Sequence, residues 1–286
     1  MNNLAQKRQD GGIELSHSDF NAIAGIVRKN AGIDLNEAKL GLVKSRLQKR
    51  LRTLDLRSFR DYLNLVNSSN GAAELDELIC AISTNVTSFN REPHHFVHFR
   101  EKVLPSLIKK MKAREKVRIW SAGCSNGSEA FTVACAVLDA YPDALKCDFK
   151  ILASDIDKYS LETGRSGIYS DDMVAKMPGS SMDKWFEKVD SGYAIDPKLR
   201  SMVSFKTLNL MAPWPIRMKY DVIFCRNVLI YFTQEDQAGL FNKFSQHLLE
   251  DAFMYIGHSE RVVGTAAKNL ISVGATTYQY SSKGSA

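Results

Sequence analysis

The sequence predicts an α/β fold in which a small all-α domain precedes an open parallel sheet with helices on both faces. Helical periodicity without strand patterns fills roughly the first eighty residues. An apolar run then ends in a glycine-bearing turn within 117–131, and strand and helix patterns alternate from there onward. These observations predict two domains, 1–83 and 84–286.

Composition is typical of a globular enzyme. The chain has 286 residues, of which 44% are hydrophobic and 24% charged, enough for two domains with cores of their own. Its apolar stretches fall short of the ~20 residues that a membrane helix needs, and the first twelve residues lack the apolar core of a signal peptide. We therefore expect a cytoplasmic protein without membrane insertion.

Cysteine usage argues against a disulfide framework and against a zinc site. The five cysteines are scattered, odd in number and never spaced as C-x-x-C. We predict five free thiols and no bound metal.

Amphipathic helices are expected throughout the domain 1–83. Ser16 and Ser18 are candidate caps for the first helix, and a stripe of leucine and valine residues defines the second. The expected helices cover residues 15–30, 36–54, 58–66 and 72–83.

The second of these helices carries a strongly basic face. Between Lys39 and Arg60, eight basic residues and one acid give a net charge of +7, against +6 for the whole chain. Such a face suits an acidic partner, either a phosphate backbone or a carboxylate-rich helix, although a solvated face that binds nothing has the same pattern. The sequence lacks interleaved aromatic residues and nucleic-acid-binding motifs, so nucleic acid is not expected. The residues predicted to bind the partner are Lys44, Arg46, Lys49, Arg50 and Arg52.

The segment VRIWSAGCSNGSEAF, residues 117–131, has the outline of a nucleotide-cofactor site. A buried strand is followed by a turn containing Gly123 and Gly127, and Glu129 opens the next helix. The following strand, FKILASDID, ends in Asp155, where a carboxylate can accept both hydroxyls of a ribose. A strand-turn-helix unit without a cofactor site could also contain these two glycines, but it would not require an acidic residue at the end of the next strand.

The glycine spacing favours a cofactor without a pyrophosphate. Neither G-x-G-x-x-G nor the phosphate loop G-x-x-x-x-G-K-[ST] occurs in the chain. S-adenosylmethionine combines an adenosine with an amino acid, so its pocket requires ribose acceptors and no phosphate cradle.

The rest of the chain continues the alternation of a doubly wound sheet. Asp155, Asn209 and Asn227 each follow a predicted strand, so they are expected at the carboxyl edge of the sheet, where open α/β folds bind ligands. A small antiparallel β-subdomain is expected at about 180–202. The remaining predicted helices cover 159–166 and 236–249, and the remaining strands cover 203–208, 220–232, 252–260 and 278–280.

The motifs TNVTSFNREPHHF, SAGCSNGSEAFTVA, ILASDID, SGIY, NLM, DVIFCRNVLIYF and GHSE occur in one order across nearly the whole chain. In this order they resemble the CheR family, the chemoreceptor glutamate methyltransferases of bacterial chemotaxis. The resemblance implies a Rossmann-like domain that uses S-adenosylmethionine and releases S-adenosylhomocysteine. It further implies that the partner is the cytoplasmic helical domain of methyl-accepting chemotaxis receptors, whose glutamates become methyl esters.

The resemblance also assigns site residues. Arg91 and Tyr231 would hold the substrate glutamate near the methyl group. Because this reaction has no proton to move, His94, His95, His98 and His258 are expected to be structural. The cofactor contacts would be Asn85, Thr87, Arg91, Glu129, Asp155, Asn209, Leu210, Arg226 and Asn227.

Two departures from the family pattern bear on function. Asn90 stands where the family usually has a second phenylalanine, which makes a cofactor-binding signalling module without turnover one alternative. A nucleic-acid methyltransferase that uses the basic helix is the other. The segment 188–197 is shorter than in members that dock a receptor's C-terminal pentapeptide, so we predict an enzyme that is independent of that pentapeptide and treat it as a monomer.

Overall fold

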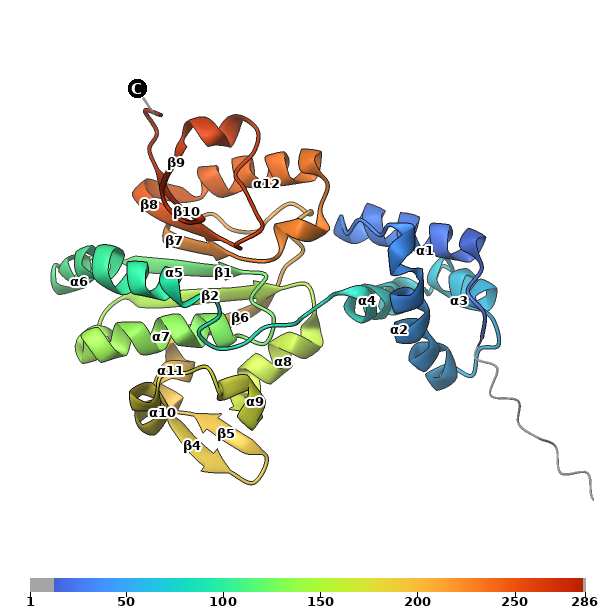
Figure 1. The fold of residues 1–286 in the computed structure, drawn as a ribbon, viewed down its shortest axis with the longest axis horizontal. Helices are drawn as coiled ribbons and strands as arrows, with labels where there is room; N and C mark the ends of the chain where they lie inside the picture. The colour runs from blue at the N-terminus through green and yellow to red at the C-terminus, as the bar shows by residue number, and fades with distance from the viewer. Residues whose placement is uncertain (1–12, 285–286) are drawn as a thin grey trace, which may run out of the picture. The chain divides into compact units, whose positions relative to one another are not determined.

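The computed structural model describes residues 13–284 and divides the chain into two compact units, one ending at Ser83 and the other beginning at Thr84 (Figure 1). The signal-peptide expectation concerns residues 1–12, which lie outside the described range. Among the described residues, none of the helices combines the length and apolar character needed to cross a bilayer.

The N-terminal unit is entirely helical. The hydroxyl of Ser16 accepts a hydrogen bond from Asp19 N at 3.0 Å and caps the start of the first helix, whose end is capped by Gly32 with φ of 72°. Apolar residues at helical spacing, among them Phe20, Val43 and Leu47, are fully buried in one core. The helices are α1 (His17–Ala31), the 3₁₀ turn η1 (Glu37–Lys39), α2 (Leu40–Thr53), α3 (Phe59–Val66) and α4 (Ala72–Ile82).

The C-terminal unit contains a seven-stranded sheet in the order β6-β2-β1-β7-β8-β10-β9. The first five strands in this order pair in parallel, and β10 pairs antiparallel with both β8 and β9. The strands are β1 (Val117–Ala122), β2 (Phe149–Asp155), β6 (Val203–Thr207), β7 (Tyr220–Cys225), β8 (Leu248–Ile256), β9 (Leu270–Gly274) and β10 (Thr277–Tyr280). Because β2 and β7 flank β1, the strand order reverses there, and a ligand site is expected at the carboxyl ends of β1 and β7.

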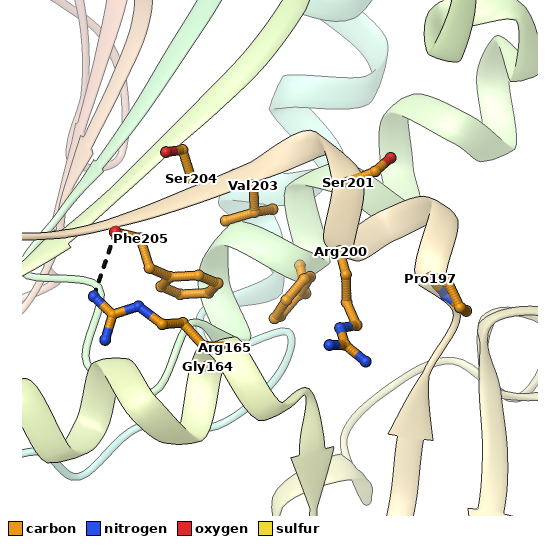
Figure 2. A pocket seen from close by; sticks show the side chains of 9 residues that line it. Gly164, Arg165, Pro197, Arg200, Ser201, Val203, Ser204 and Phe205 are labelled. Carbon is orange, nitrogen blue, oxygen red and sulfur yellow. Dashed lines mark hydrogen bonds between the residues drawn. The ribbon is translucent and has the colours of Figure 1, made fainter.

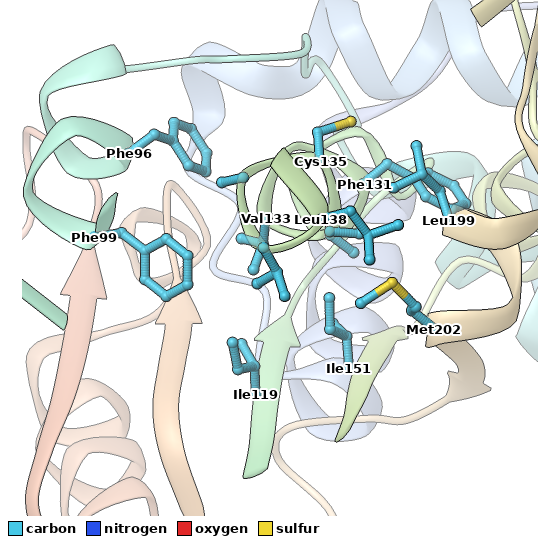
Figure 3. Packing of buried hydrophobic residues seen from close by; sticks show 14 of the residues in the cluster. Phe96, Phe99, Ile119, Phe131, Val133, Cys135, Leu138, Ile151, Leu199 and Met202 are labelled. Carbon is cyan, nitrogen blue, oxygen red and sulfur yellow. The ribbon is translucent and has the colours of Figure 1, made fainter. Parts of the chain in front are cut away.

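Alternating side chains fill the two faces of this sheet. Ile119 of β1 and Ile151 of β2 point into a core covered by the helices that carry Phe96, Phe99 and Val133 (Figure 3). Trp120, next to Ile119, points to the opposite face, where it packs with Ile223 and Phe244. Buried strands of a parallel sheet therefore appear as continuous apolar runs in the sequence.

The helices of this unit were only partly predicted. The helices before β1 are α5 (Pro93–His98), the π-helical segment η2 (Phe99–Val103) and α6 (Leu104–Lys112), none of which was predicted. The later ones are α7 (Ser128–Ala140), α8 (Lys158–Ser166), α9 (Asp171–Val174), α10 (Gly179–Trp185), α11 (Pro197–Met202) and α12 (Gln234–Gln246), with 3₁₀ turns η3 (Pro142–Lys146), η4 (Leu229–Tyr231) and η5 (Thr265–Lys268).

A separate three-stranded antiparallel sheet forms the predicted β-subdomain. Its order is β3-β5-β4, with β3 at Ile168–Tyr169, β4 at Phe186–Val189 and β5 at Gly192–Ile195. The predicted range 180–202 omits β3, because two residues are too few to show an alternating pattern. The fold class itself is confirmed: an all-α unit precedes a Rossmann-like domain with a small antiparallel subdomain.

Candidate active site

The turn between β1 and α7 requires glycine at two positions. Gly123 and Gly127 have φ of 71° and 82°, in the left-handed region that other residues avoid. A Cβ on Gly123 would lie 2.4 Å from Val228 Cγ2, and one on Gly127 would lie 2.6 Å from Phe205 Cζ. A backbone hydrogen bond links the turn to β2, since Gly123 N donates to the carbonyl of Ser154 at 2.8 Å.

The carboxylate of Asp155 lies beside this turn, at the end of β2. It accepts hydrogen bonds from Ser125 N at 2.7 Å and from Asp157 N at 2.9 Å. Burial raises the pKa of Asp155, although these backbone hydrogen bonds partly oppose the rise. Each carboxylate oxygen has two lone pairs, so the group can still accept hydroxyl donors.

A buried chain of charges crosses the carboxyl edge of the sheet. Arg226, whose side chain is 2% exposed, lies 3.1 Å from Glu129 Oε2 and 3.3 Å from Glu92 Oε2. Glu129 also accepts from Ser121 Oγ at 2.6 Å, and Glu92 from His258 Nδ1 at 2.8 Å. Three segments far apart in the sequence thus share one network of two acids and one guanidinium.

The two acids of this network differ in their pKa shifts. Burial raises the pKa of Glu129, and Arg226 only partly opposes that rise. Burial acts in the same direction on Glu92, but hydrogen bonds from His258 and Asn227 and the charge of Arg226 outweigh it and lower the pKa of Glu92 to about 2. Glu92 is therefore ionised at neutral pH.

Among the described residues, Arg226 Nε, a donor, and Asn227 Oδ1, an acceptor, are buried at this edge without a hydrogen-bond partner, and so is Glu92 Oε2, which makes only ion pairs. Buried polar groups are nearly always satisfied, so an unpaired donor and an unpaired acceptor on adjacent residues suit a polar ligand. The amino-acid part of S-adenosylmethionine carries both an anionic and a cationic group, and the residues fit it.

The segment before α5 brings three predicted residues to this edge. Asn85 Nδ2 donates to Asp157 Oδ2 at 2.5 Å, and the hydroxyl of Thr87 lies 3.4 Å from that of Ser128, the first residue of α7. The backbone carbonyl of Arg91 accepts a short hydrogen bond from the guanidinium of Arg226.

The side chains of Arg91 and Asn90 are held locally. Arg91 Nη1 donates to the carbonyl of Val86 at 2.8 Å. Asn90 has φ of 51°, and its N–H donates to Thr132 Oγ1 at 3.2 Å on α7. The asparagine is compatible with this left-handed conformation, which asparagine tolerates better than most residues.

Glu260 shapes the loop that carries Asn227 and Tyr231. Its buried carboxylate accepts from the backbone N–H groups of Asn227 at 3.1 Å and Leu229 at 2.7 Å. Tyr231 is half-buried in the 3₁₀ turn η4 that follows. The backbone also approaches closely here, since a Cβ on Gly257 would lie 2.5 Å from Asn227 Nδ2. Sequence reasoning quoted the GHSE motif but gave Glu260 no role.

Asn209 and Leu210 follow β6 and have structural partners. Asn209 Oδ1 accepts from Met211 N at 2.9 Å, which caps its own loop. Leu210 is buried in the core with Trp120 and Ile223.

The predicted basic face divides into paired and exposed residues. Arg46 Nη1 donates to the carbonyls of Ile82 and Ser83 at 2.6 and 2.8 Å, where α4 ends. Arg50 Nε donates to the buried carboxylate of Glu74 at 2.7 Å, and Lys44 pairs with Glu14 at 2.8 Å. Lys49 and Arg52 are exposed.

One described cluster has the composition of a metal site. Ligand atoms of Glu92, His94 and His95 all lie within 4.8 Å of one another. Glu92 is already paired with Arg226, however, and His95 Nε2 lies 3.2 Å from the carbonyl of Ala275. Because the Arg226 guanidinium already pairs with Glu92, the one carboxylate of this cluster, the cluster is poorly suited to a metal cation.

A doubly wound sheet with a polar site at its switch point is typical of the class of α/β proteins that bind a nucleotide cofactor. A family model described as "CheR methyltransferase, SAM binding domain" matches residues 85–279, and one described as "CheR methyltransferase, all-alpha domain" matches residues 18–83. The chain belongs to the CheR methyltransferase family.

Curated relatives agree with this assignment. A probable chemotaxis protein methyltransferase of Rhizobium etli is 42% identical over 91% of this chain and 98% of its own length. Chemotaxis protein methyltransferases of Borreliella burgdorferi and Escherichia coli are 38% and 34% identical, over 97% and 87% of this chain and 99% and 86% of their own lengths. Among solved structures, a glycopeptide N-methyltransferase complexed with S-adenosylmethionine covers 60% of this chain and 51% of its own, with a TM-score of 0.33 and 10% identity.

Proposed function

We propose that this protein transfers the methyl group of S-adenosylmethionine to glutamate side chains of methyl-accepting chemotaxis receptors, forming glutamate methyl esters. Membership of the CheR methyltransferase family supports a methyltransferase of chemotaxis. The observation that carries the proposal is the pair of unpaired polar atoms on Arg226 and Asn227, next to Glu129.

In this proposal the two ends of the cofactor have separate partners. Glu129 and Asn227 Oδ1 accept from the ammonium group, and Arg226 Nε donates to the carboxylate. Asp155 accepts from the ribose hydroxyls, with Asn85, Thr87, Asn209 and Leu210 completing the pocket. When bound, the cofactor supplies an activated methyl group on a sulfonium.

The chemistry requires alignment more than acid-base catalysis. A bond forms between a glutamate oxygen and the methyl carbon while the carbon–sulfur bond breaks, and the bonding electrons leave on a neutral thioether. The carboxylate is already the nucleophile, so no proton has to be removed. Well-oriented approach contributes roughly 7–11 kcal/mol. Arg91 and Tyr231 hold the carboxylate by charge and by hydroxyl.

The acceptor is a cytoplasmic receptor helix rich in acidic residues. Exposed Lys49 and Arg52 on α2 supply uncompensated charge for such a helix. We further propose a cytoplasmic monomer that needs no receptor pentapeptide. The short hairpin, with only Asp190 and Ser191 between β4 and β5, supports that independence.

Incubation with radiolabelled S-adenosylmethionine and receptor-containing membranes tests this function. Base-labile label on the receptor supports it. Label in nucleic acid, or cofactor binding without any transfer, contradicts it and supports one of the two alternatives, neither of which the comparisons favour.

A further inference from the structure

A cavity of about 560 Å³ lies apart from the residues of the candidate active site (Figure 2). Residues of α7, α8, α11 and β6 line it. Pockets for small molecules typically have volumes of about 300–1,000 Å³, so this cavity has room for one small organic molecule.

Two arginines give the cavity a positive charge. Arg165 on α8 and Arg200 on α11 are exposed, and no acidic residue is among those that line the cavity. Neither guanidinium forms an ion pair with a carboxylate within 4.0 Å in the described part of the chain. The hydrogen bond drawn as a dashed line in Figure 2, from Arg165 Nη2 to the carbonyl of Phe205, is long at 3.4 Å.

Apolar side chains lie between these charges. The rings of Phe131 and Phe205 have centroids 5.8 Å apart, and Val203 lies beside them. Figure 2 shows Val203 and Phe205 on the side of β6 that faces the arginines, with the Ser204 hydroxyl on the opposite side. The cavity therefore combines cationic groups with an aromatic wall.

This cavity is distinct from the candidate cofactor site. The ring of Phe205 packs over Gly127 and Gly164, where an added Cβ would lie 2.6 and 2.5 Å from ring atoms. The ring thus fills the space between the cavity and the turn before α7. None of the predicted cofactor residues lines the cavity.

We propose that the cavity binds a small organic anion, with its carboxylate or phosphate group held by Arg165 or by Arg200, which lie on opposite sides of the Phe205 ring, and a ring or short apolar body against Phe205 and Val203. Planar guanidinium groups bind both anions through paired hydrogen bonds. The aromatic wall favours an amphiphilic anion over a bare ion, because burying the apolar body adds free energy of binding.

Calorimetric titration of the full chain with phenyl phosphate and with benzoate tests the proposal, in the presence of saturating S-adenosylhomocysteine so that the cofactor site is filled. We expect at least one of these anions to bind, the tighter one identifying the head group, and inorganic phosphate and benzyl alcohol to bind more weakly. Arg165→Gln or Arg200→Gln, whichever removes the guanidinium that holds the head group, should weaken binding about tenfold, the usual effect of losing a charge-assisted hydrogen bond, and an unchanged affinity in both variants overturns the proposal.

Lys198→Gln is the matched control, because it removes the same charge from α11 at a residue that does not line the cavity. It should leave the affinity unchanged. Failure of both anions to bind at millimolar concentrations, or equal weakening by Lys198→Gln, overturns the proposal. If S-adenosylhomocysteine itself does not bind, the proposed function fails while the same variants, titrated without it, still decide this site.

Discussion

At the scale of single residues, the proposed catalytic role of the Arg91 side chain can be tested separately from the structural role of its backbone. Its backbone carbonyl holds Arg226, whereas its side chain contacts only the nearby carbonyl of Val86 among the hydrogen bonds described above. Arg91→Ala retains the carbonyl and removes the guanidinium. We expect methyl transfer to receptor membranes to be abolished while the thermal unfolding midpoint stays that of the parent.

Arg100→Ala is the control, since Arg100 is an exposed arginine nearby in η2. It should methylate at the parent rate. An Arg91→Ala variant that also does so would show that the guanidinium does not hold the substrate.

In the proposed cofactor site, Glu92 holds Arg226 in place through their ion pair. Glu92→Gln keeps the size of the side chain but removes the charge 3.3 Å from a guanidinium that is 2% exposed. Since hydrogen bonds to charged groups contribute about 1.5–3 kcal/mol, we expect S-adenosylhomocysteine to bind at least tenfold more weakly. Methylthioadenosine, which lacks the amino-acid part, should bind as it does to the parent.

Calorimetry with the two ligands separates this role from a general structural one. Equal losses of affinity for both ligands would show that Glu92 only stabilises the fold. Glu101→Gln, at an exposed acid of η2, should change neither affinity.

The charge network itself could not be predicted from the sequence. The motifs indicated Glu129 and Arg226 one at a time, but Glu92 joins them only after α5, α7 and β7 have packed together. Glu260 was missed for a related reason, since its partners are backbone N–H groups, which the sequence does not distinguish.

At the scale of elements, the start of α7 depends on Gly127. Gly127→Ala places a Cβ 2.6 Å from the Phe205 ring at φ of 82°. The clash and the left-handed conformation should together cost more than about 1 kcal/mol of unfolding free energy. Gly239→Ala is the opposite case, because that glycine lies within α12 with nothing inside 4 Å, and the substitution should stabilise by up to about 1 kcal/mol.

Urea denaturation of both variants measures these two effects. Equal stability of Gly127→Ala and the parent would mean that the turn relaxes freely, and the steric account of this turn would be wrong.

Within α2, the basic residues should separate into two groups. Arg50→Gln leaves the buried carboxylate of Glu74 without its partner, and we expect it to destabilise the protein by about 2 kcal/mol or more. Arg52→Gln removes an exposed charge, so stability should not change while receptor methylation falls, most clearly at low salt.

Urea denaturation and initial methylation rates at two ionic strengths check this division. Unchanged methylation by Arg52→Gln at both ionic strengths would remove this side chain from the proposed receptor surface. The composition of the sequence predicted that α2 is basic. It could not predict which basic side chains form hydrogen bonds or ion pairs within the N-terminal unit.

Element boundaries were wrong where one stretch fits two periodicities. The helix predicted over 236–249 ends at Gln246, and the strand predicted from 252 begins at Leu248. Leu248 and Leu249 continue the helical stripe and equally begin an apolar strand. The strand β9 was missed because it pairs only with β10 at the edge of the sheet and lacks a continuous apolar run.

At the scale of the whole molecule, the fold class followed from patterns that many residues share. Alternation of buried strands with amphipathic helices is repeated along the sheet domain, so a few misplaced ends do not change the architecture. The site is different, because each contact depends on one pair of residues brought together by the complete fold.

His95 links the helices before β1 to the opposite end of the chain and makes stability depend on pH. Its ring is fully buried, with Nε2 at 2.8 Å from Thr276 Oγ1 and 3.2 Å from the carbonyl of Ala275. Burial, followed by the charges of Arg226 and His94, lowers the pKa of His95 from 6.5 to about 3, against the opposing effect of Glu92.

The unfolded chain therefore binds a proton at His95 below pH 6.5 that the folded chain does not, and stability is lost as the pH falls from 6.5 towards 3. Each pH unit in this range costs at most about 1.4 kcal/mol. The contribution of Glu92 is lost in a lower window, between its usual pKa of 4.5 and about 2, so the slope above about pH 5 contains little from Glu92.

We expect His95→Gln to flatten the dependence of unfolding free energy on pH between about 6.5 and 5, whatever its absolute stability, because the amide fills the site without titrating. The remaining slope includes His98, whose pKa burial also lowers. His17→Gln, at an exposed residue of α1, should keep the parent slope. Urea titrations at several pH values measure the slopes, and parallel curves for His95→Gln and the parent would mean that another group carries the pH dependence.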